Sequence, residues 1–184
     1  MTVHRRLATL GVLLAAALVL PGCMSGPGVS GSFDRNYTVT GHTRLEVTDP
    51  SGQVNIAGSA DGQVHIHGEV HASGMGFDKP KERLDQTLAD PGIEQKGDTI
   101  RVGKRLSGMR NVSIDYKIEA PHDTEVNVTA LSGSQNIRDV RGPVTSQGAS
   151  GSIRVDHVER DTRINSASGS IEVSDIGDDV RASS

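Results

Sequence analysis

The chain has 184 residues and a formal net charge of −4, with no Trp, two Phe and two Tyr. Nucleic-acid binding needs a basic surface and is helped by aromatic rings that stack on bases, so this composition excludes it. Glycine accounts for 22 residues. Together with frequent Ser, Thr, Asn and Asp, this favours a turn-rich, all-β protein of one domain.

The first 22 residues have the pattern of a bacterial signal peptide. Arg5 and Arg6 precede an apolar run over residues 7–20, which is shorter than the roughly 20 residues of a membrane-spanning helix. The run ends in Leu-Pro-Gly-Cys, which resembles the lipobox of bacterial lipoproteins, where the cysteine becomes the lipidated first residue. We therefore expect a lipid anchor on Cys23 that places the protein in the cell envelope, at the outer membrane or the cell surface. A signal peptide without lipidation is the alternative.

Cys23 is the only cysteine, which excludes a disulfide within the chain. Residues 23–36 begin with a stretch rich in Gly and Ser, and we expect them to form a flexible tether to a folded domain at 37–184. Removing residues 1–22 takes away two arginines, so the formal charge becomes −4 − 2 = −6. The mature protein is mildly acidic.

Residues 38–120 are expected to form short strands and one helix. Alternating apolar residues predict strands at 38–47, 53–56, 64–71 and 112–120, and a hairpin over 93–102. Leu84 and Leu88 lie four residues apart within residues 79–89. This spacing suits one short amphipathic helix.

The histidine-rich strand is the best candidate for a metal site. In an extended strand the odd positions share one face, which groups His65, His67, Glu69 and His71 away from the core. Two histidines two residues apart can bind one ion, and a third ligand could complete a zinc site. We take His65, His67 and His71 as candidate ligands, with a further ligand needed from a neighbouring strand. The alternative is a solvent-exposed polar face, and no other cofactor is expected.

Two other polar groupings carry less chemistry. Asp175, Asp178 and Asp179 form an acidic corner that calcium could occupy, but a solvated corner is the better interpretation. Asp156 and His157 are adjacent, so in a regular strand they point to opposite faces and cannot act together.

A triplet, Ser-Gly-Ser, recurs with a fixed period in the last third of the chain. It occupies residues 132–134, 150–152 and 168–170, so the spacings are 150 − 132 = 18 and 168 − 150 = 18. The residues behind the triplet also align in apolar columns. These columns are Ile137/Val155/Val173, Val140/Val158/Ile176 and Val144/Thr162/Val180.

Each eighteen-residue unit predicts two short strands joined by two corners, with Gly133, Gly151 and Gly169 at turns that need positive φ. One unit cannot bury its apolar side alone, so we expect units stacked about 4.8 Å apart. The predicted fold is an all-β, β-solenoid-like stack with one short helix before the repeats. Because no capping segment follows Ser184, we expect the domain to be truncated at its C-terminal end.

Residues 116–128, Tyr-Lys-Ile-Glu-Ala-Pro-His-Asp-Thr-Glu-Val-Asn-Val, are followed by Ser-Gly-Ser-Ile-x-Val-x-x-Val units. This arrangement resembles the bacterial DUF4097 family of adhesin-type domains, which is similar to the GIN-domain envelope proteins. The resemblance covers residues 38–184 and implies a β-solenoid-like domain outside the cytoplasm. It brings no established catalytic residues. The first unit departs from the pattern, with Gln135 in place of the isoleucine, and we expect this to weaken the first coil.

Together these patterns predict a non-catalytic lipoprotein of the cell envelope. It would bind an unknown envelope protein or glycan, or serve a structural role, and it would contact the membrane through the lipid on Cys23. The sequence has no nucleophile elbow, phosphate loop or His-Glu-x-x-His motif. A solenoid-type polysaccharide-active enzyme and an accessory protein in envelope signalling are the alternatives.

Overall fold

The computed structural model describes residues 28–74, 79–103 and 111–184. The predicted signal peptide and Cys23 lie outside the described residues. The elements are β1 (Val29–Thr38), β2 (Arg44–Ser51), β3 (Val54–Ser59), β4 (Gln63–Ala72), α1 (Pro80–Ala89), β5 (Glu94–Lys96), β6 (Thr99–Val102), β7 (Val112–Pro121), β8 (Glu125–Ser132), β9 (Gln135–Val140), β10 (Val144–Ser150), β11 (Ile153–Val158), β12 (Thr162–Ser166), β13 (Ile171–Ile176) and β14 (Val180–Ser183).

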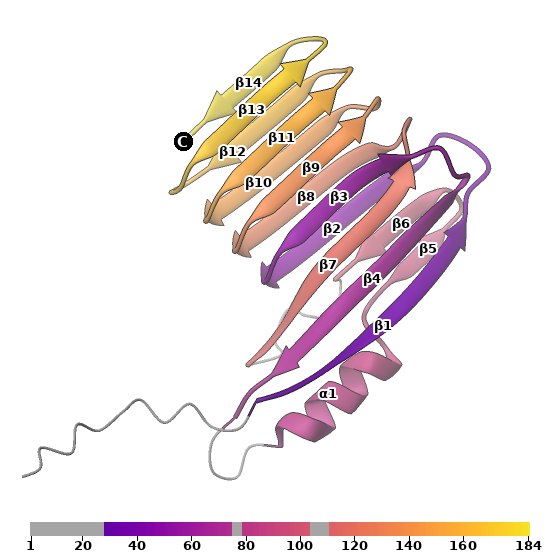
Figure 1. Ribbon diagram of the computed structural model, residues 1–184, viewed down its shortest axis with the longest axis vertical. Helices are drawn as coiled ribbons and strands as arrows, with labels where there is room; N and C mark the ends of the chain where they lie inside the picture. Colours follow the sequence, from indigo (N-terminus) through magenta and orange to yellow (C-terminus); the bar gives the residue numbers. More distant parts are fainter. Residues whose placement is uncertain (1–27, 75–78, 104–110) are drawn as a thin grey trace, which may run out of the picture.

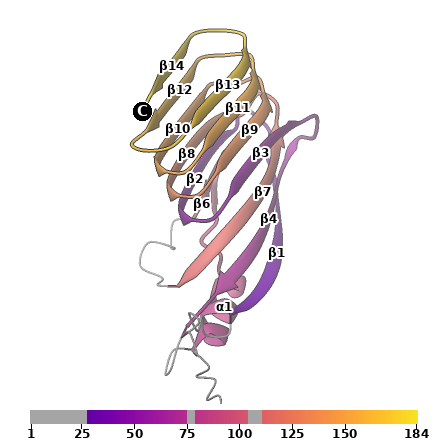
Figure 2. The same cartoon turned by 60° about the vertical axis from the view of Figure 1, so that its left-hand side comes forward.

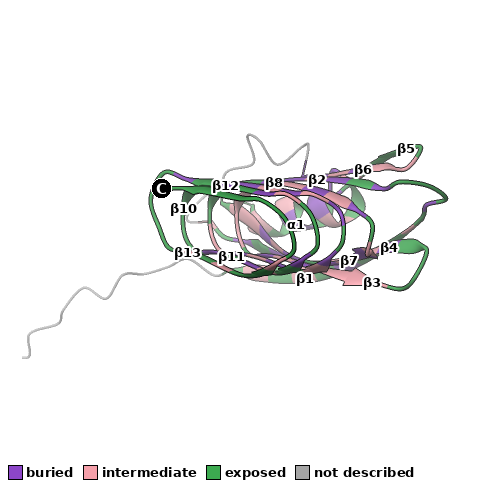
Figure 3. Cartoon of the chain, turned by 90° about the horizontal axis from the view of Figure 1, so that it is seen from above, coloured by how far each residue is buried: buried purple, intermediate pink, exposed green. Residues whose placement is uncertain are grey.

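The strands form two seven-stranded sheets that lie as two layers (Figures 1 and 3). The first sheet has the order β1-β4-β7-β3-β9-β11-β13, and the second has the order β14-β12-β10-β8-β2-β6-β5. From β8 onward, successive strands belong to alternate sheets, so the chain crosses between the layers after each strand (Figure 2). The described part of the protein is therefore mostly β with one short helix, as predicted.

Parallel pairing joins the strands from β8 to β14, and their partners lie eighteen residues apart. In the second sheet Val126 pairs with Val144, Val144 with Thr162, and Thr162 with Val180. In the first sheet Val155 pairs with residues Ile137 and Val173. The side-by-side columns predicted from the sequence are confirmed by these registers.

Two earlier strands join the same stack, which the eighteen-residue spacing did not predict. β2 pairs in parallel with β8 and β3 with β9, so Leu45 lies beside Val126, 126 − 45 = 81 residues away. On its other side β2 pairs with β6, and β3 pairs with β7. We call β2, β3 and β8 to β14 the parallel stack.

Apolar side chains of both sheets fill the space between the layers. In β4, Val64, Ile66 and Val70 are buried while the alternate positions face outward. The same alternation runs through β11, where Ile153 and Val155 are buried. Burial of these β-branched residues drives the association of the two sheets.

A column of four glycines marks one corner of the parallel stack. Gly133, Gly151 and Gly169 have φ of +122°, +114° and +134°, and Gly52 has +138°. A Cβ on each of the three later glycines would collide with the backbone of the preceding glycine in the column. The corner therefore needs glycine both for its φ and for the close approach of neighbouring backbones.

Gln135, expected to weaken the first coil, is buried in the core with its polar atoms paired. Its side-chain oxygen accepts a hydrogen bond from Ser146 Oγ at 2.6 Å, and its Nε2 donates to the Gln147 carbonyl at 3.0 Å. Ser146 occupies a column otherwise filled by Val128 and Ile164. Because the two departures from the apolar pattern meet each other across the sheets, neither leaves a buried group unpaired.

The tether prediction is wrong for residues 29–36, which belong to β1. This strand pairs antiparallel with β4 along its whole length, from Val29 opposite Ala72 to Thr38 opposite Gln63. Phe33 is buried in the core, and Gly31 lies against Leu84 and Leu88 of α1. Tertiary pairing thus overrides a composition typical of a linker. We call β1, β4, β7 and α1 the antiparallel end.

An acidic residue is buried where the parallel stack meets the antiparallel end. Asp49 on β2 and Tyr116 on β7 are each 1% exposed. Asp49 Oδ2 and the Tyr116 hydroxyl have no hydrogen-bond partner within the described structure, although Asp49 Oδ1 accepts from Ser51 N. Burial raises the pKa of Asp49 to about 6 and also raises the pKa of Tyr116, where the nearby Asp49 carboxylate contributes.

Candidate functional site

The predicted histidine face exists, on the outer side of β4. His65, His67 and His71 are partly to largely exposed, and each meets a polar group of a neighbouring strand. His67 Nδ1 lies 2.8 Å from Asp34 Oδ1, and His65 Nδ1 lies 2.8 Å from Asn36 Oδ1, both on β1. On the other side of β4, His71 Nε2 lies 3.4 Å from Asp115 Oδ2.

These contacts supply the neighbouring-strand partners that the sequence left unnamed, but each histidine meets a different one. The structure does not gather His65, His67 and His71 into one ligand group. Across residues 28–74, 79–103 and 111–184, one set of three His or acidic residues has ligand atoms within 4.8 Å of one another, and it lies elsewhere.

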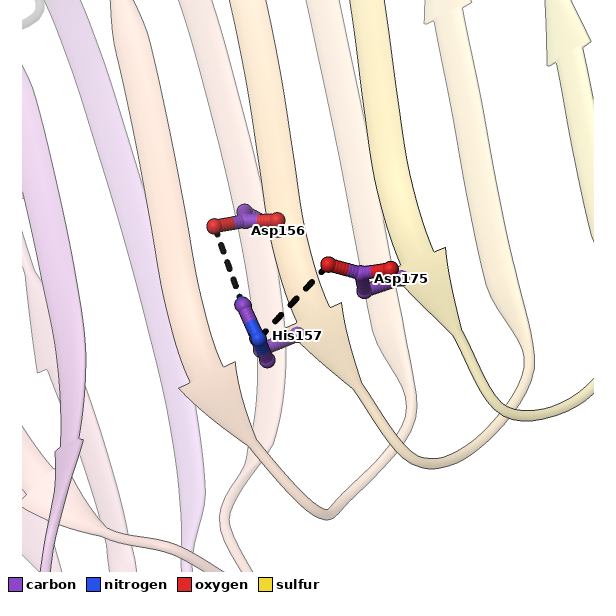
Figure 4. Close-up of side chains that lie close together, drawn as sticks. All are labelled: Asp156, His157 and Asp175. Atoms are coloured by element: carbon purple, nitrogen blue, oxygen red, sulfur yellow. Dashed lines mark ion pairs between the residues drawn. The ribbon is translucent and has the colours of Figure 1, made fainter.

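That set consists of Asp156 and His157 on β11 and Asp175 on β13 (Figure 4). His157 Nδ1 lies 3.0 Å from Asp156 Oδ2, and His157 Nε2 lies 3.6 Å from Asp175 Oδ2. The imidazole is thus placed between two carboxylates from neighbouring strands. We call these three residues the Asp-His-Asp cluster.

The expectation that Asp156 and His157 point to opposite faces is wrong. His157 has φ of +50°, a left-handed conformation that interrupts the regular strand. The pairing passes from Asp156 opposite Ser174 to Val158 opposite Ile176, so His157 and Asp175 are both skipped and the two strands share a left-handed kink at the same register position. At this kink the imidazole lies beside the side chain of the preceding residue, Asp156.

The same conformation recurs at the equivalent positions of the neighbouring strands. Asp139 has φ of +59° and Asp175 has +48°, each eighteen residues from His157. Asn, Asp and His tolerate the left-handed region better than most residues. A column of Asp, His and Asp at a fixed spacing was therefore the sequence signal for this kink.

Hydrogen bonding and charge shift the two titrating groups in opposite directions. The hydrogen bond from Ser174 Oγ, 2.6 Å long, and then the His157 side chain lower the pKa of Asp156. The hydrogen bond and charge of Asp156 raise the pKa of His157, with smaller contributions from Asp175 and Asp139. Both shifts favour the charged pair.

Several hollows lie on the parallel stack, and two of them lie along its first sheet. One, of about 400 Å³, runs along the kinked positions and is lined by His122, Asp139, His157, Glu159 and Asp175, among others. The other, of about 250 Å³, crosses β9, β11 and β13 at equivalent positions. Its lining includes Ser134, Ser152 and Ser170, and Asn136, Arg154 and Glu172. We call the second hollow the cross-strand groove.

Cys23, the predicted lipidation site, lies outside the described residues. Among the residues that are described, no helix has the length and apolar character needed to cross a membrane.

Comparison with known proteins adds little. No family model matches the chain, and no curated protein matches it. A solved structure of a "putative cell adhesion protein" from Clostridium sporogenes aligns with 84% of this chain and 98% of its own, at 13% identity and a TM-score of 0.37. A likeness at this level does not establish a shared fold or activity, so the resemblance to DUF4097 stays a prediction.

Proposed function

We propose that the protein is an exported, lipid-anchored module of the cell envelope that binds an extended partner without catalysis. The observation that carries this proposal is the cross-strand groove. It is lined by the same positions of three neighbouring strands, so an extended glycan or peptide running across the strands would meet repeated polar groups. The signal-peptide pattern and Cys23 support the export and the anchor.

The parallel stack has the features of a β-solenoid. We infer that β8 to β14, with β2 and β3 beside them, form successive coils of a β-solenoid with an eighteen-residue period. The parallel registers and the column of glycines support it. A stack of this kind holds its outward side chains at fixed spacing, which suits recognition of a repetitive partner.

The chemistry of the groove favours binding over hydrolysis. Glycoside hydrolysis needs two carboxyl groups placed on either side of the bond to be broken. The carboxylate that lines this groove, Glu172, is held by Arg154, whose Nε and Nη2 donate to one of its oxygens at 3.0 and 2.5 Å. A carboxylate engaged in this way is a poor general base but a suitable part of a polar binding surface.

Site-specific photocrosslinking in cells tests the proposal. A photoreactive residue at Ser152 lies in the cross-strand groove, and one at Arg163 on β12 lies on the outer side of the other sheet. We expect a discrete protein or glycan adduct from position 152 and none from position 163. Equal adducts from both positions, or none from either, would contradict binding at the groove.

A further inference from the structure

The Asp-His-Asp cluster has no part in the proposed groove, and its chemistry points to a different ligand. We propose that Asp156, His157 and Asp175 bind a divalent transition-metal ion, with zinc as the best chemical match. The three residues offer one imidazole nitrogen and two carboxylate oxygens from two neighbouring strands. Zinc accepts this mixed set, whereas calcium and magnesium prefer oxygen ligands alone.

The spacing of the ligand atoms suits a single ion. Zinc binds nitrogen and oxygen at about 2.0 to 2.2 Å in a tetrahedral arrangement, so two of its ligand atoms lie roughly 3.3 to 3.6 Å apart. One ligand atom from each of the three residues lies within 4.8 Å of the others. The contacts of His157 with Asp156 and Asp175, at 3.0 and 3.6 Å, run to opposite ring nitrogens, and only one of these nitrogens can bind a given ion. Nδ1, on the side of Asp156, would coordinate the ion, and Asp175, whose side chain is 69% exposed, would rotate toward it.

The backbone holds the ligands in place before an ion arrives. The left-handed residues His157 and Asp175 lie opposite each other in paired strands. Just beyond them, Gly177 N donates to the Val158 carbonyl at 2.8 Å. Ser174 Oγ donates to the second oxygen of Asp156 and so fixes that carboxylate from behind. Such supporting hydrogen bonds orient metal ligands and raise their affinity.

The hollow along the kinked positions leaves space beside the ligands. His157 and Asp175 both line this hollow of about 400 Å³. Three protein ligands leave one position of a tetrahedral zinc open, and a water molecule reaching it through the hollow would complete the coordination. An open fourth position distinguishes this arrangement from a closed structural zinc site.

The test is a titration of the purified chain with zinc alone, measured by isothermal calorimetry, with Co²⁺ absorbance as a second readout of coordination. The informative variants are H157N and D175N, because asparagine tolerates the left-handed conformation that both positions require. We expect one ion per chain in the parent protein and at least a tenfold weaker affinity in each variant. Melting curves without metal establish that the variants fold.

Two matched controls separate this site from the rest of the surface. D139N changes the equivalent left-handed position one strand away, and Asp139 lies outside the cluster. H67N changes the histidine face of β4. We expect both to bind zinc like the parent. Zinc binding that H157N leaves unchanged, binding that H67N removes, or no binding at millimolar zinc would each overturn the proposal.

Discussion

The parallel stack and the antiparallel end bury their interiors by different means. In the stack, equivalent residues of adjacent strands lie side by side, and at the glycine column the backbones themselves come into contact. At the antiparallel end, large side chains fill the interior. The Phe33 and Tyr116 ring centroids lie 6.4 Å apart in an edge-to-face contact, and Leu84 of α1 lies beside Gly31 of β1. In the parallel stack, the close approach of backbones therefore limits which substitutions are tolerated. At the antiparallel end, the packing of side chains sets this limit.

A pair of glycines shows the contrast. A Cβ on Gly151 would meet the backbone of Gly133, whereas a Cβ on Gly68 in β4 would meet the ring of Phe33. A ring can turn away at some cost in packing. The Gly133 carbonyl lies in a corner whose flanking residues, Ser132 and Gln135, are both paired with the neighbouring strands, so it cannot move without disturbing those pairs. This difference predicts where the molecule tolerates change.

The largest expected effect is that of Gly151→Ala. Alanine at φ of +114° is strained by about 1 to 3 kcal/mol, and the collision with Gly133 adds about 1 to 3 kcal/mol. We expect the free energy of unfolding, measured in urea, to fall by about 4 kcal/mol. Gly68→Ala should lose less, because the Phe33 ring can adjust.

Gly97→Ala is the matched control for backbone conformation alone. Gly97 has φ of +59° in the turn between β5 and β6, and nothing lies within 4 Å of an added Cβ. We expect a loss of about 1 kcal/mol. If Gly151→Ala cost no more than Gly97→Ala, close backbone contact would not limit the stack.

Asp49 tests the boundary between the two regions, with the next largest effect. Burial raises its pKa from an ordinary value of 3.8 to about 6 in the folded protein, a difference worth about 3 kcal/mol. Below pH 4 Asp49 is protonated in both the folded and the unfolded chain, so its ionisation does not lower the free energy of unfolding. As the pH rises from 4 to 6 the unfolded chain releases its proton first, so the folded protein loses stability, and the loss is complete above pH 6.

Asp49→Asn should remove this dependence. We expect the variant and the parent to unfold alike near pH 4, and the variant to be more stable by up to about 3 kcal/mol at pH 7. Urea unfolding at pH 4, 5, 6 and 7 measures the difference. A constant difference between D49N and the parent across this range would contradict burial of an ionised Asp49.

The two regions also differ in how much of them the sequence predicts. In the last third of the chain the Ser-Gly-Ser spacing specifies the strand pairs, because each strand's partner lies one period away. The helix at Pro80–Ala89 and the hairpin of β5 and β6 were likewise predicted, since both depend on local contacts. Pairing over longer distances was not: β2 beside β8 spans 81 residues, and β1 was mistaken for part of a tether.

The candidate sites follow the same division. The outward face of His65, His67 and His71 was predicted by simple alternation along one strand. The Asp-His-Asp cluster was missed because alternation fails where a residue adopts a left-handed φ, and a regular strand would place His157 on the side away from Asp156. Its position depends on one residue's φ, which a hydrophobic pattern does not reveal.

A smaller effect, of about 1 to 2 kcal/mol, is expected for the buried polar pair of the stack. Ser146→Val removes the donor to Gln135 Oε1 and leaves that oxygen buried without it. Gln135→Ile leaves the Ser146 hydroxyl in the same state. The double variant Q135I/S146V restores the apolar columns and should be at least as stable as the parent. A double-mutant cycle in urea measures the coupling, and additive losses would show that the two side chains do not depend on each other.

The smallest effect is expected on the outer face of the stack. Arg154 and Glu172 form an ion pair between β11 and β13, but their side chains are 60% and 63% exposed. Exposed pairs contribute less than about 1 kcal/mol because water screens them and both side chains lose freedom. R154A and E172A should therefore unfold almost like the parent, with Arg163→Ala on the other sheet as the comparison. Losses above 2 kcal/mol would mean that this pair holds β11 and β13 together. A loss near zero would mean that Arg154 and Glu172 can give up their mutual ion pair and bind a partner in the cross-strand groove without loss of stability. An effect of R154A on crosslinking would then be attributable to binding rather than to unfolding.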